Sequence, residues 1–138
     1  SFQEIQSEDE LIRIVVPGDN AALSPNRANG SHWRTTSRAK KSAKNRALIA
    51  WHAAGCPRVQ GPFPVRVDIT IRRGRVMDTD NALASLKAVI DGLFKGQCTP
   101  DDSSAFLDLQ TPKQETGRAW VGREEVEFVI FSCEHREK

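Results

Sequence analysis

Four aspartates form two short groups in the second half of the chain: Asp78 and Asp80, two residues apart, and the neighbours Asp101 and Asp102. Mg²⁺ prefers carboxylate oxygens and usually takes one or two of them beside water and phosphate oxygens. In an extended segment, residues two apart point to the same side, so Asp78 and Asp80 could converge on one ion. A metal site is therefore one interpretation of these acids. Aspartates that only cap a helix are the alternative.

A helix predicted to start after Asp78 would carry two more charged residues on the face of Asp80. At about 100° per residue, Asp80, Lys87 and Asp91 lie within roughly 40° of one another. Asp91 would lie about 16 Å along the axis from Asp80, so we expect it to pair with a lysine or to contact a second subunit rather than share a metal ion with Asp80. Lys87 could approach a phosphate held at the acids, or it could pair with Asp91.

The basic residues are concentrated in one segment. Between Asp19 and Asp68, 48 residues contain no acid and nine bases, a charge of +9, whereas the other 90 residues hold 18 acids against 11 bases, a charge of −7. Such asymmetry indicates a polyanionic partner, and a solvated helix face is the alternative. The predicted DNA contacts, which include a basic stretch further along the chain, are Arg34, Arg38, Lys41, Lys44, Arg72, Arg73 and Arg75.

Three other residue types could take part in chemistry. Trp33, between His32 and Arg34, could stack on an unpaired base, or it could be a buried core residue. The three histidines, His32, His52 and His135, lack the spacing of metal ligands. The cysteines Cys56, Cys98 and Cys133 form no C-x-x-C pair and are odd in number, so we expect reduced thiols that act as small buried hydrophobes.

Hydrophobic periodicity and turn residues predict the elements that position these side chains. We expect a strand at 11–16, a surface loop at 19–31, and a basic helix that has Thr35 or Thr36 as its N-cap and ends near Ala54. Arg38, Lys41 and Lys44 of this helix should face solvent, while one stripe should pack against the core: Ala39, Ala43, Ala47, Leu48, Ala50 and Trp51. A half-buried strand at 65–71 follows, then a basic loop at 72–75 and a second helix from Asp78 to about Gly96. Two last strands are expected near 104–110 and 123–131, joined as a hairpin. The predicted order is β-α-β-α-β-β.

The size of the chain predicts a single α+β domain. Its 138 residues and 15.3 kDa suit one core, with residues 1–10 as a flexible leader and 11–138 as the folded domain. No apolar run approaches the roughly 20 residues of a membrane span, and no signal peptide is visible. We therefore expect a cytoplasmic protein without membrane contact and without a small-molecule cofactor.

Three segments together are more specific than any one of them alone: Asp78–Asn81 (DTDN), Lys87–Leu93 (KAVIDGL) and Asp101–Ser103 (DDS). They resemble the D-x-D-N…K…D-x-L…D-D pattern of the RusA-type Holliday junction resolvases, a family common in phages and prophages. The residues at 23–26 and 32–34 are similar to the N-terminal region of that family, so the resemblance covers most of 11–132. One spacing departs from the pattern: the typical lysine follows the second aspartate by one helical turn, whereas Lys87 follows Asp80 by seven residues.

The resemblance implies a structure-selective endonuclease of DNA recombination and repair that cuts four-way junctions as a homodimer. It also implies a small mixed sheet flanked by helices and a requirement for Mg²⁺, for which Mn²⁺ could substitute. By the same resemblance, Asp78, Asp80 and Asp102 are the metal-binding and catalytic acids and Asp101 is a weaker candidate. Lys87 would contact the phosphate or the transition state.

Two functions from different classes are compatible with these residues. As an enzyme, the protein would use a metal ion to activate water and to neutralise the scissile phosphate. As a binding module, it would hold or remodel DNA with residues 20–67 and cut nothing. The acids favour the enzyme, because carboxylates beside phosphate repel it unless a metal ion lies between them.

Overall fold

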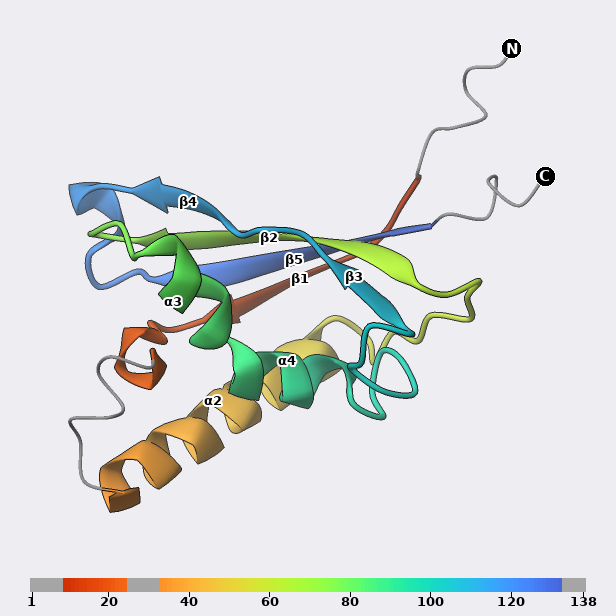
Figure 1. Cartoon of the computed structure of the whole chain (residues 1–138), viewed down its shortest axis with the longest axis horizontal. Coiled ribbons are helices and arrows are strands. Elements are labelled where there is room, and N and C mark those ends of the chain that lie inside the picture. The colour runs from red at the N-terminus through yellow and green to blue at the C-terminus, as the bar shows by residue number, and fades with distance from the viewer. Residues whose placement is uncertain (1–8, 25–32, 133–138) are drawn as a thin grey trace, which may run out of the picture.

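The computed structural model describes residues 9–24 and 33–132, which form one mixed sheet with helices (Figure 1). The strands are β1 (Asp9–Pro17), β2 (Val65–Arg73), β3 (Leu107–Leu109), β4 (Lys113–Thr116) and β5 (Glu125–Ser132). The α-helices are α2 (Trp33–Ala53), α3 (Thr79–Ala84) and α4 (Lys87–Phe94), and two short 3₁₀ helices are η2 (Ala21–Leu23) and η3 (Arg118–Trp120). The α+β class predicted from the sequence is confirmed.

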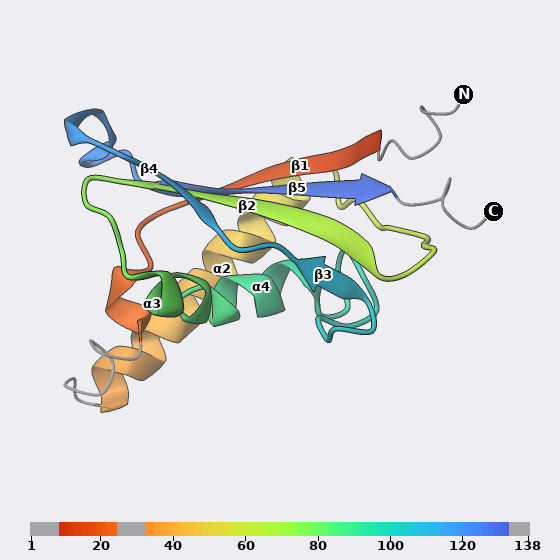
Figure 2. The same cartoon turned by 45° about the horizontal axis from the view of Figure 1, so that its top comes forward.

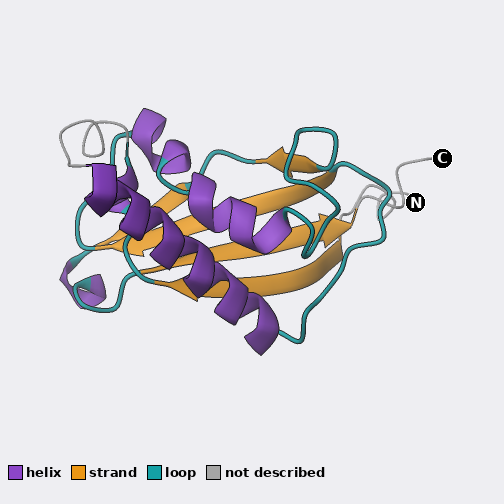
Figure 3. Cartoon of the chain, turned by 90° about the horizontal axis from the view of Figure 1, so that it is seen from below, coloured by secondary structure: helices purple, strands orange, loops and turns teal. Residues whose placement is uncertain are grey.

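The sheet has the order β1-β5-β2-β3, and β4 also pairs with β2. β5 is antiparallel to both of its neighbours, whereas β3 and β4 run parallel to β2. A parallel pair needs a crossover connection, and here α3 and α4 supply it between β2 and β3. The α-helices all lie on one face of the sheet (Figure 3).

The core lies between this face and the helices. Alternate residues of β2 point into it, so Val65, Val67, Ile69 and Ile71 are buried while the residues between them are half-buried. Helix α2 contributes Ala43, Ala47, Ala50 and Trp51, as its predicted apolar stripe required, and α4 contributes Val89, Ile90, Leu93 and Phe94. Alanines let α2 lie close to its neighbours, and this closeness positions the acids described below.

The first strand and the basic helix are longer than predicted. β1 starts at Asp9, inside the expected leader, whose residues 1–8 lie outside the described part of the chain, as do residues 25–31 of the expected loop. Helix α2 starts at Trp33, so Thr35 and Thr36 are helical residues and not its N-cap, which is a correction. It ends before Gly55, whose φ of +94° suits a residue without a side chain.

The single second helix predicted after Asp78 is wrong. The chain forms α3 and α4 instead, separated by Ser85 and Leu86. The Ser85 hydroxyl donates a hydrogen bond to the carbonyl oxygen of Ala82 at 2.8 Å, and the Leu86 amide bonds three residues back, to Leu83, rather than four. Serine side chains compete in this way with the helical backbone. Projection of Asp80, Lys87 and Asp91 onto one continuous helix therefore does not describe this segment.

The predicted C-terminal hairpin is also wrong. β3 and the additional strand β4 pair with one edge of β2, and β5 pairs with its other edge. The chain passes around the end of β2 through η3 before β5 begins. The alternation of apolar and polar residues predicted the strands. Which strands become neighbours depends instead on how they assemble into one apolar sheet face that packs against the helices.

The predicted basic loop at 72–75 belongs in part to β2, because pairing with β4 and β5 extends the strand through Arg72 and Arg73. On the sheet face away from the helices, Arg72 donates to Glu115, Glu125 and Glu127 at 2.6–2.8 Å. The hydrogen bond to Glu115 raises the pKa of Arg72 most, against the effect of burial, which lowers it.

Among the described residues, no helix combines the length and apolar character that a membrane crossing requires.

Candidate functional site

The close contact between α2 and α4 forms one side of the candidate site (Figure 2). Gly92 of α4 is buried, and a Cβ atom added there would lie 2.9 Å from both the Ala47 Cβ and the Lys44 carbonyl oxygen of α2. Only glycine allows this approach. As a result, Asp91, the residue before it, meets Lys44, with 3.8 Å between Oδ2 and Nζ.

A loop that folds back at the end of α4 forms the other side. The Cys98 amide donates to the Leu93 carbonyl oxygen at 2.9 Å. The hydroxyl of the buried Thr99 lies 3.0 Å from the carbonyl oxygen of Phe94 and 2.7 Å from that of Asp101. These bonds hold the turn that ends at Asp101 and Asp102, which are both half-buried.

The return of this loop brings Asp102 to Asp91. A hydrogen bond between the two carboxyl groups raises the pKa of Asp102 above its ordinary value, and burial adds to the effect. The negative charges of Asp91 and Asp101 raise it further. A carboxyl group donates a hydrogen bond only when it is protonated, so Asp102 holds its proton more tightly than an isolated aspartate does.

Asp78 and Asp80 lie elsewhere, at the start of α3, and both are exposed. Asp78 occupies the N-cap position, and its backbone carbonyl oxygen accepts from Asn81 and Ala82 at 3.0 and 2.9 Å. Its side chain makes no capping hydrogen bond. Asp78 therefore lies at the N-cap, as the capping alternative predicted, but its carboxylate does not cap the helix.

The structure does not gather the predicted acids Asp78, Asp80, Asp101 and Asp102 into one group. Within residues 9–24 and 33–132, no set of three or more His, Cys, Asp or Glu side chains is close enough to hold one metal ion. Asp102 is paired with Asp91 instead, a residue that the sequence pattern assigned to a lysine contact. That contact exists, but the lysine is Lys44 and not Lys87, which is exposed at the start of α4.

The pairing of Asp91 and Asp102 could not be read from the sequence. A helical projection places Asp91 relative to Asp80 and Lys87 only, because it treats one helix at a time. The signal for Asp102 lies in Thr99, whose small hydroxyl side chain can bond to local carbonyl groups and turn the chain back. Such a turn indicates that the chain reverses direction, but it does not indicate which residue Asp102 will contact.

The predicted basic contacts divide into two groups. Arg34, Arg38, Lys41 and Lys44 are exposed on α2, as expected. Arg72 is held by three glutamates, and Arg73 pairs with Asp19 at 3.1 Å and donates to the Arg75 carbonyl oxygen at 2.7 Å. The first group is turned toward solvent, whereas the guanidinium groups of Arg72 and Arg73 are engaged by the protein itself. Arg75 is exposed.

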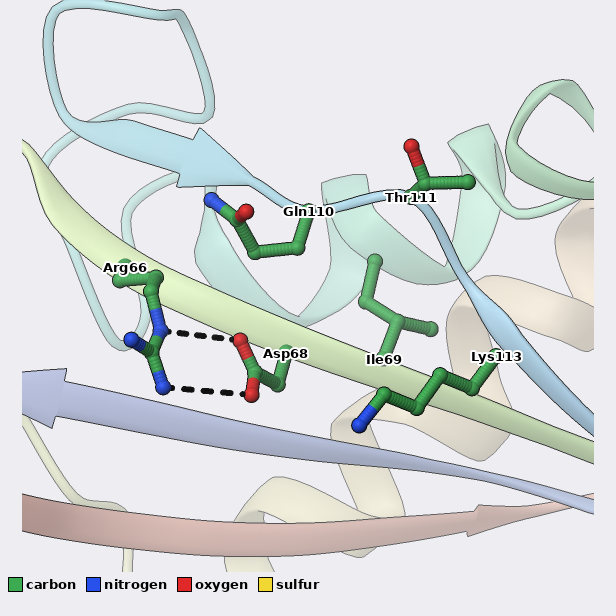
Figure 4. A pocket seen from close by; sticks show the side chains of 6 residues that line it. All are labelled: Arg66, Asp68, Ile69, Gln110, Thr111 and Lys113. Carbon is green, nitrogen blue, oxygen red and sulfur yellow. Dashed lines mark hydrogen bonds and ion pairs between the residues drawn. The ribbon is translucent and has the colours of Figure 1, made fainter.

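Two hollows lie near these elements. One of about 420 Å³ is on the sheet face away from the helices and contains none of the predicted site residues; Figure 4 shows its lining residues, Arg66, Asp68, Ile69, Gln110, Thr111 and Lys113. Arg66 and Asp68 form an ion pair there, with 3.0 Å between Nε and Oδ1. The other hollow, about 310 Å³, lies on α2 beside Trp33.

The cysteines differ from the prediction in one case. Cys98 is buried, and burial raises its thiol pKa to about 12, which keeps it protonated and inert. Cys56 is only half-buried at the border of the core, and its Sγ lies 3.2 Å from Nδ1 of His52. Cys133 lies outside the described residues.

Comparison with known proteins finds no family model, no curated protein and no solved structure that matches this chain.

Proposed function

We propose that this protein is a Mg²⁺-dependent endonuclease that cuts four-way junctions and other branched DNA by attack of water on a phosphodiester. The observation that carries the proposal is the Asp91–Asp102 carboxyl pair beside the cationic helix α2. The negative charge of Asp91 opposes ionisation of the half-buried Asp102, so the arrangement costs stability once Asp102 loses its proton. A divalent cation between them would remove that cost.

The donor set suits Mg²⁺. This ion takes oxygen ligands and commonly binds one or two carboxylates, with water and phosphate oxygens completing the shell. Asp91 and Asp102 supply two such groups, with Asp101 adjacent. A bound ion would lower the pKa of a water molecule and neutralise charge on the phosphate. Asp78 and Asp80 remain candidates from the sequence pattern alone.

The basic residues of α2 would hold the DNA backbone beside the acids. Lys44 is the nearest, since its ammonium group lies 3.8 Å from Asp91 and about half of its side chain is exposed. Arg38 and Lys41 continue the same cationic surface toward the start of the helix. These groups would position a phosphate by charge without reading the bases. Lys87 remains a candidate contact to the phosphate from the first residue of α4.

The same proposal includes a symmetric homodimer. Resolution of a four-way junction requires two cuts on strands related by a two-fold axis, and one copy of this chain offers one Asp102. Cyclic dimers are the commonest protein assemblies and supply a second site by symmetry. Light scattering of the free protein and paired cuts in one binding event on cruciform DNA would support the dimer; a monomer that nicks once and dissociates would contradict it.

A cleavage assay tests the proposed activity. A labelled synthetic four-way junction is incubated with the protein, with Mg²⁺ or with a chelator, and compared with a linear duplex. We expect cutting of the junction only with Mg²⁺, and loss of cutting in Asp102→Asn. The matched control is Asp108→Asn, which removes the same charge from an exposed residue of β3. Equal cutting by wild type and Asp102→Asn would refute the proposed site.

The alternative is a DNA-binding module that does not cut. The charge of +9 on residues 20–67 favours it as much as it favours the enzyme. The two functions differ in the same assay, because a pure binder would shift the junction in a gel and leave its strands intact whatever the metal. The acid pair favours the enzyme, since carboxylates beside phosphate weaken simple binding.

A further inference from the structure

The first turns of α2 carry an exposed aromatic ring among cations. Trp33 is 68% exposed, and the guanidinium carbon of Arg34 lies 5.3 Å from the centre of its ring. These residues line the hollow of about 310 Å³ together with Ser37, Arg38 and Lys41. The sequence left open whether Trp33 is a core residue; its exposure excludes that alternative.

Helical geometry explains why this tryptophan is open to solvent. Trp33 and Trp51 are 18 residues apart, which is five turns, so both lie on the same side of α2. Trp51 is buried, and its indole nitrogen donates to the Pro57 carbonyl oxygen at 2.8 Å. At the other end, the start of α2 lies away from α4 and from the sheet (Figures 1 and 2). The side of α2 that is buried at Trp51 is therefore largely exposed at Trp33.

We infer that this end of α2 is a binding site for an unpaired nucleotide of a nucleic-acid strand, with the base stacked on Trp33 and its phosphates held by Arg34, Arg38 and Lys41. A flat aromatic ring offers a stacking surface to any base, and neighbouring cations attract the backbone. In a duplex the faces of the bases are already stacked, so an unpaired base is the form that can use Trp33. The proposed ligand class is single-stranded DNA, including gaps and splayed ends beside a branch.

The position of the site connects it to the acids. Lys44, which pairs with Asp91, lies 11 residues after Trp33, or about 16 Å along the same helix. Lys41 lies between them, and α2 has no acidic residue over its whole length. A strand stacked at Trp33 can thus follow a continuous cationic surface to Asp91 and Asp102. This inference rests on the proposed function for its substrate, and it adds the unpaired nucleotide as the feature that is recognised.

The test measures affinity and not cutting. Binding of labelled oligo(dT) and of a blunt duplex of equal length is measured by fluorescence anisotropy at one salt concentration, without Mg²⁺. Loss of base stacking on alanine substitution typically weakens binding about 5- to 150-fold. We expect Trp33→Ala to lose affinity for oligo(dT) in this range, Trp33→Phe to retain most of it, and the duplex affinity to change less than about twofold.

The matched control is Ile49→Ala. Ile49 is also 68% exposed on α2, so its removal changes the same helix by a similar loss of apolar surface. We expect it to bind oligo(dT) as the wild type does. Equal oligo(dT) binding by wild type and Trp33→Ala would overturn the inference. Competition by polyglutamate as strong as that by oligo(dT) would also overturn it, because an acidic peptide has no base to stack.

The binding test and the cleavage assay can refute the two proposals independently. If the wild type cuts the junction but Trp33→Ala binds oligo(dT) without loss, the stacking site is wrong and the nuclease stands. If nothing is cut but Trp33→Ala loses oligo(dT) affinity, the stacking site stands and the nuclease is wrong.

Discussion

The substitution Asp91→Asn tests the acid pair most directly. Asparagine keeps the volume of the side chain but removes its negative charge. The hydrogen bond that protonated Asp102 donates to Asp91 is the largest cause of the raised pKa of Asp102, so in the variant this pKa should fall toward its ordinary value. If Asp91 helps to hold Mg²⁺, the variant should also require more Mg²⁺ for cutting.

The size of this effect can be compared with that of Lys44→Ala. Two charges about 4 Å apart interact by about 4 kcal/mol at an effective dielectric constant of 20. The Lys44 and Asp91 side chains are 53% and 34% exposed, and exposed pairs are worth about 0.2–1 kcal/mol after screening. Loss of a group that only orients a metal ligand already costs about 10- to 100-fold in metal affinity. Asp91→Asn removes a proposed ligand, so it should raise the half-maximal Mg²⁺ concentration by at least about this factor, far more than Lys44→Ala does.

The assay is junction cleavage against Mg²⁺ concentration, at mildly acidic and mildly alkaline pH. In the wild type, the proton that Asp102 holds competes with the metal ion, so the half-maximal Mg²⁺ concentration should fall as pH rises. Asp91→Asn should weaken this pH dependence because the pKa of Asp102 should fall. An unchanged Mg²⁺ and pH dependence in Asp91→Asn, with cutting abolished in Asp80→Asn, would refute the pair as the metal site and favour the acids of α3.

Asp80→Asn should keep the fold and junction binding by gel shift but lose cutting, if the sequence pattern assigns it correctly; cutting at the wild-type rate removes Asp80 from the site. Lys41→Ala should reduce the slope of log affinity against log salt by about one if Lys41 contacts a phosphate, and an unchanged slope makes it a solvated residue. Gly92→Ala should destabilise the fold by about 1–3 kcal/mol in urea titration, because its Cβ would meet Ala47 and the α2 backbone at 2.9 Å; wild-type stability would show that α4 moves away freely. The raised pKa of Asp102 means that the folded chain binds the Asp102 proton more tightly than the unfolded chain does. Wild-type stability should therefore fall as pH rises from about 3.9 through that raised pKa. Asp102→Asn should remove this fall in thermal melts, and identical pH profiles of the two proteins would contradict the prediction.

The sequence alone determined the parts of this protein that depend on local periodicity. Alternation predicted β2, and the alanine stripe predicted which side of α2 is buried and that Arg38, Lys41 and Lys44 face solvent. These predictions succeed because a strand or an amphipathic helix buries one face wherever it lies in the fold. The density of bases in residues 20–67 is likewise a property of composition.

Tertiary structure decided which distant residues meet. Asp91 and Asp102 come together because Gly92 brings α4 against α2 and Thr99 turns the following loop back, and no single-element pattern contains both events. The break at Ser85 likewise depends on a local competition for hydrogen bonds that periodicity does not include. Trp33 shows the same limit. It lies on the same side of α2 as the buried Trp51, and only the positions of the sheet and α4 make Trp33 exposed.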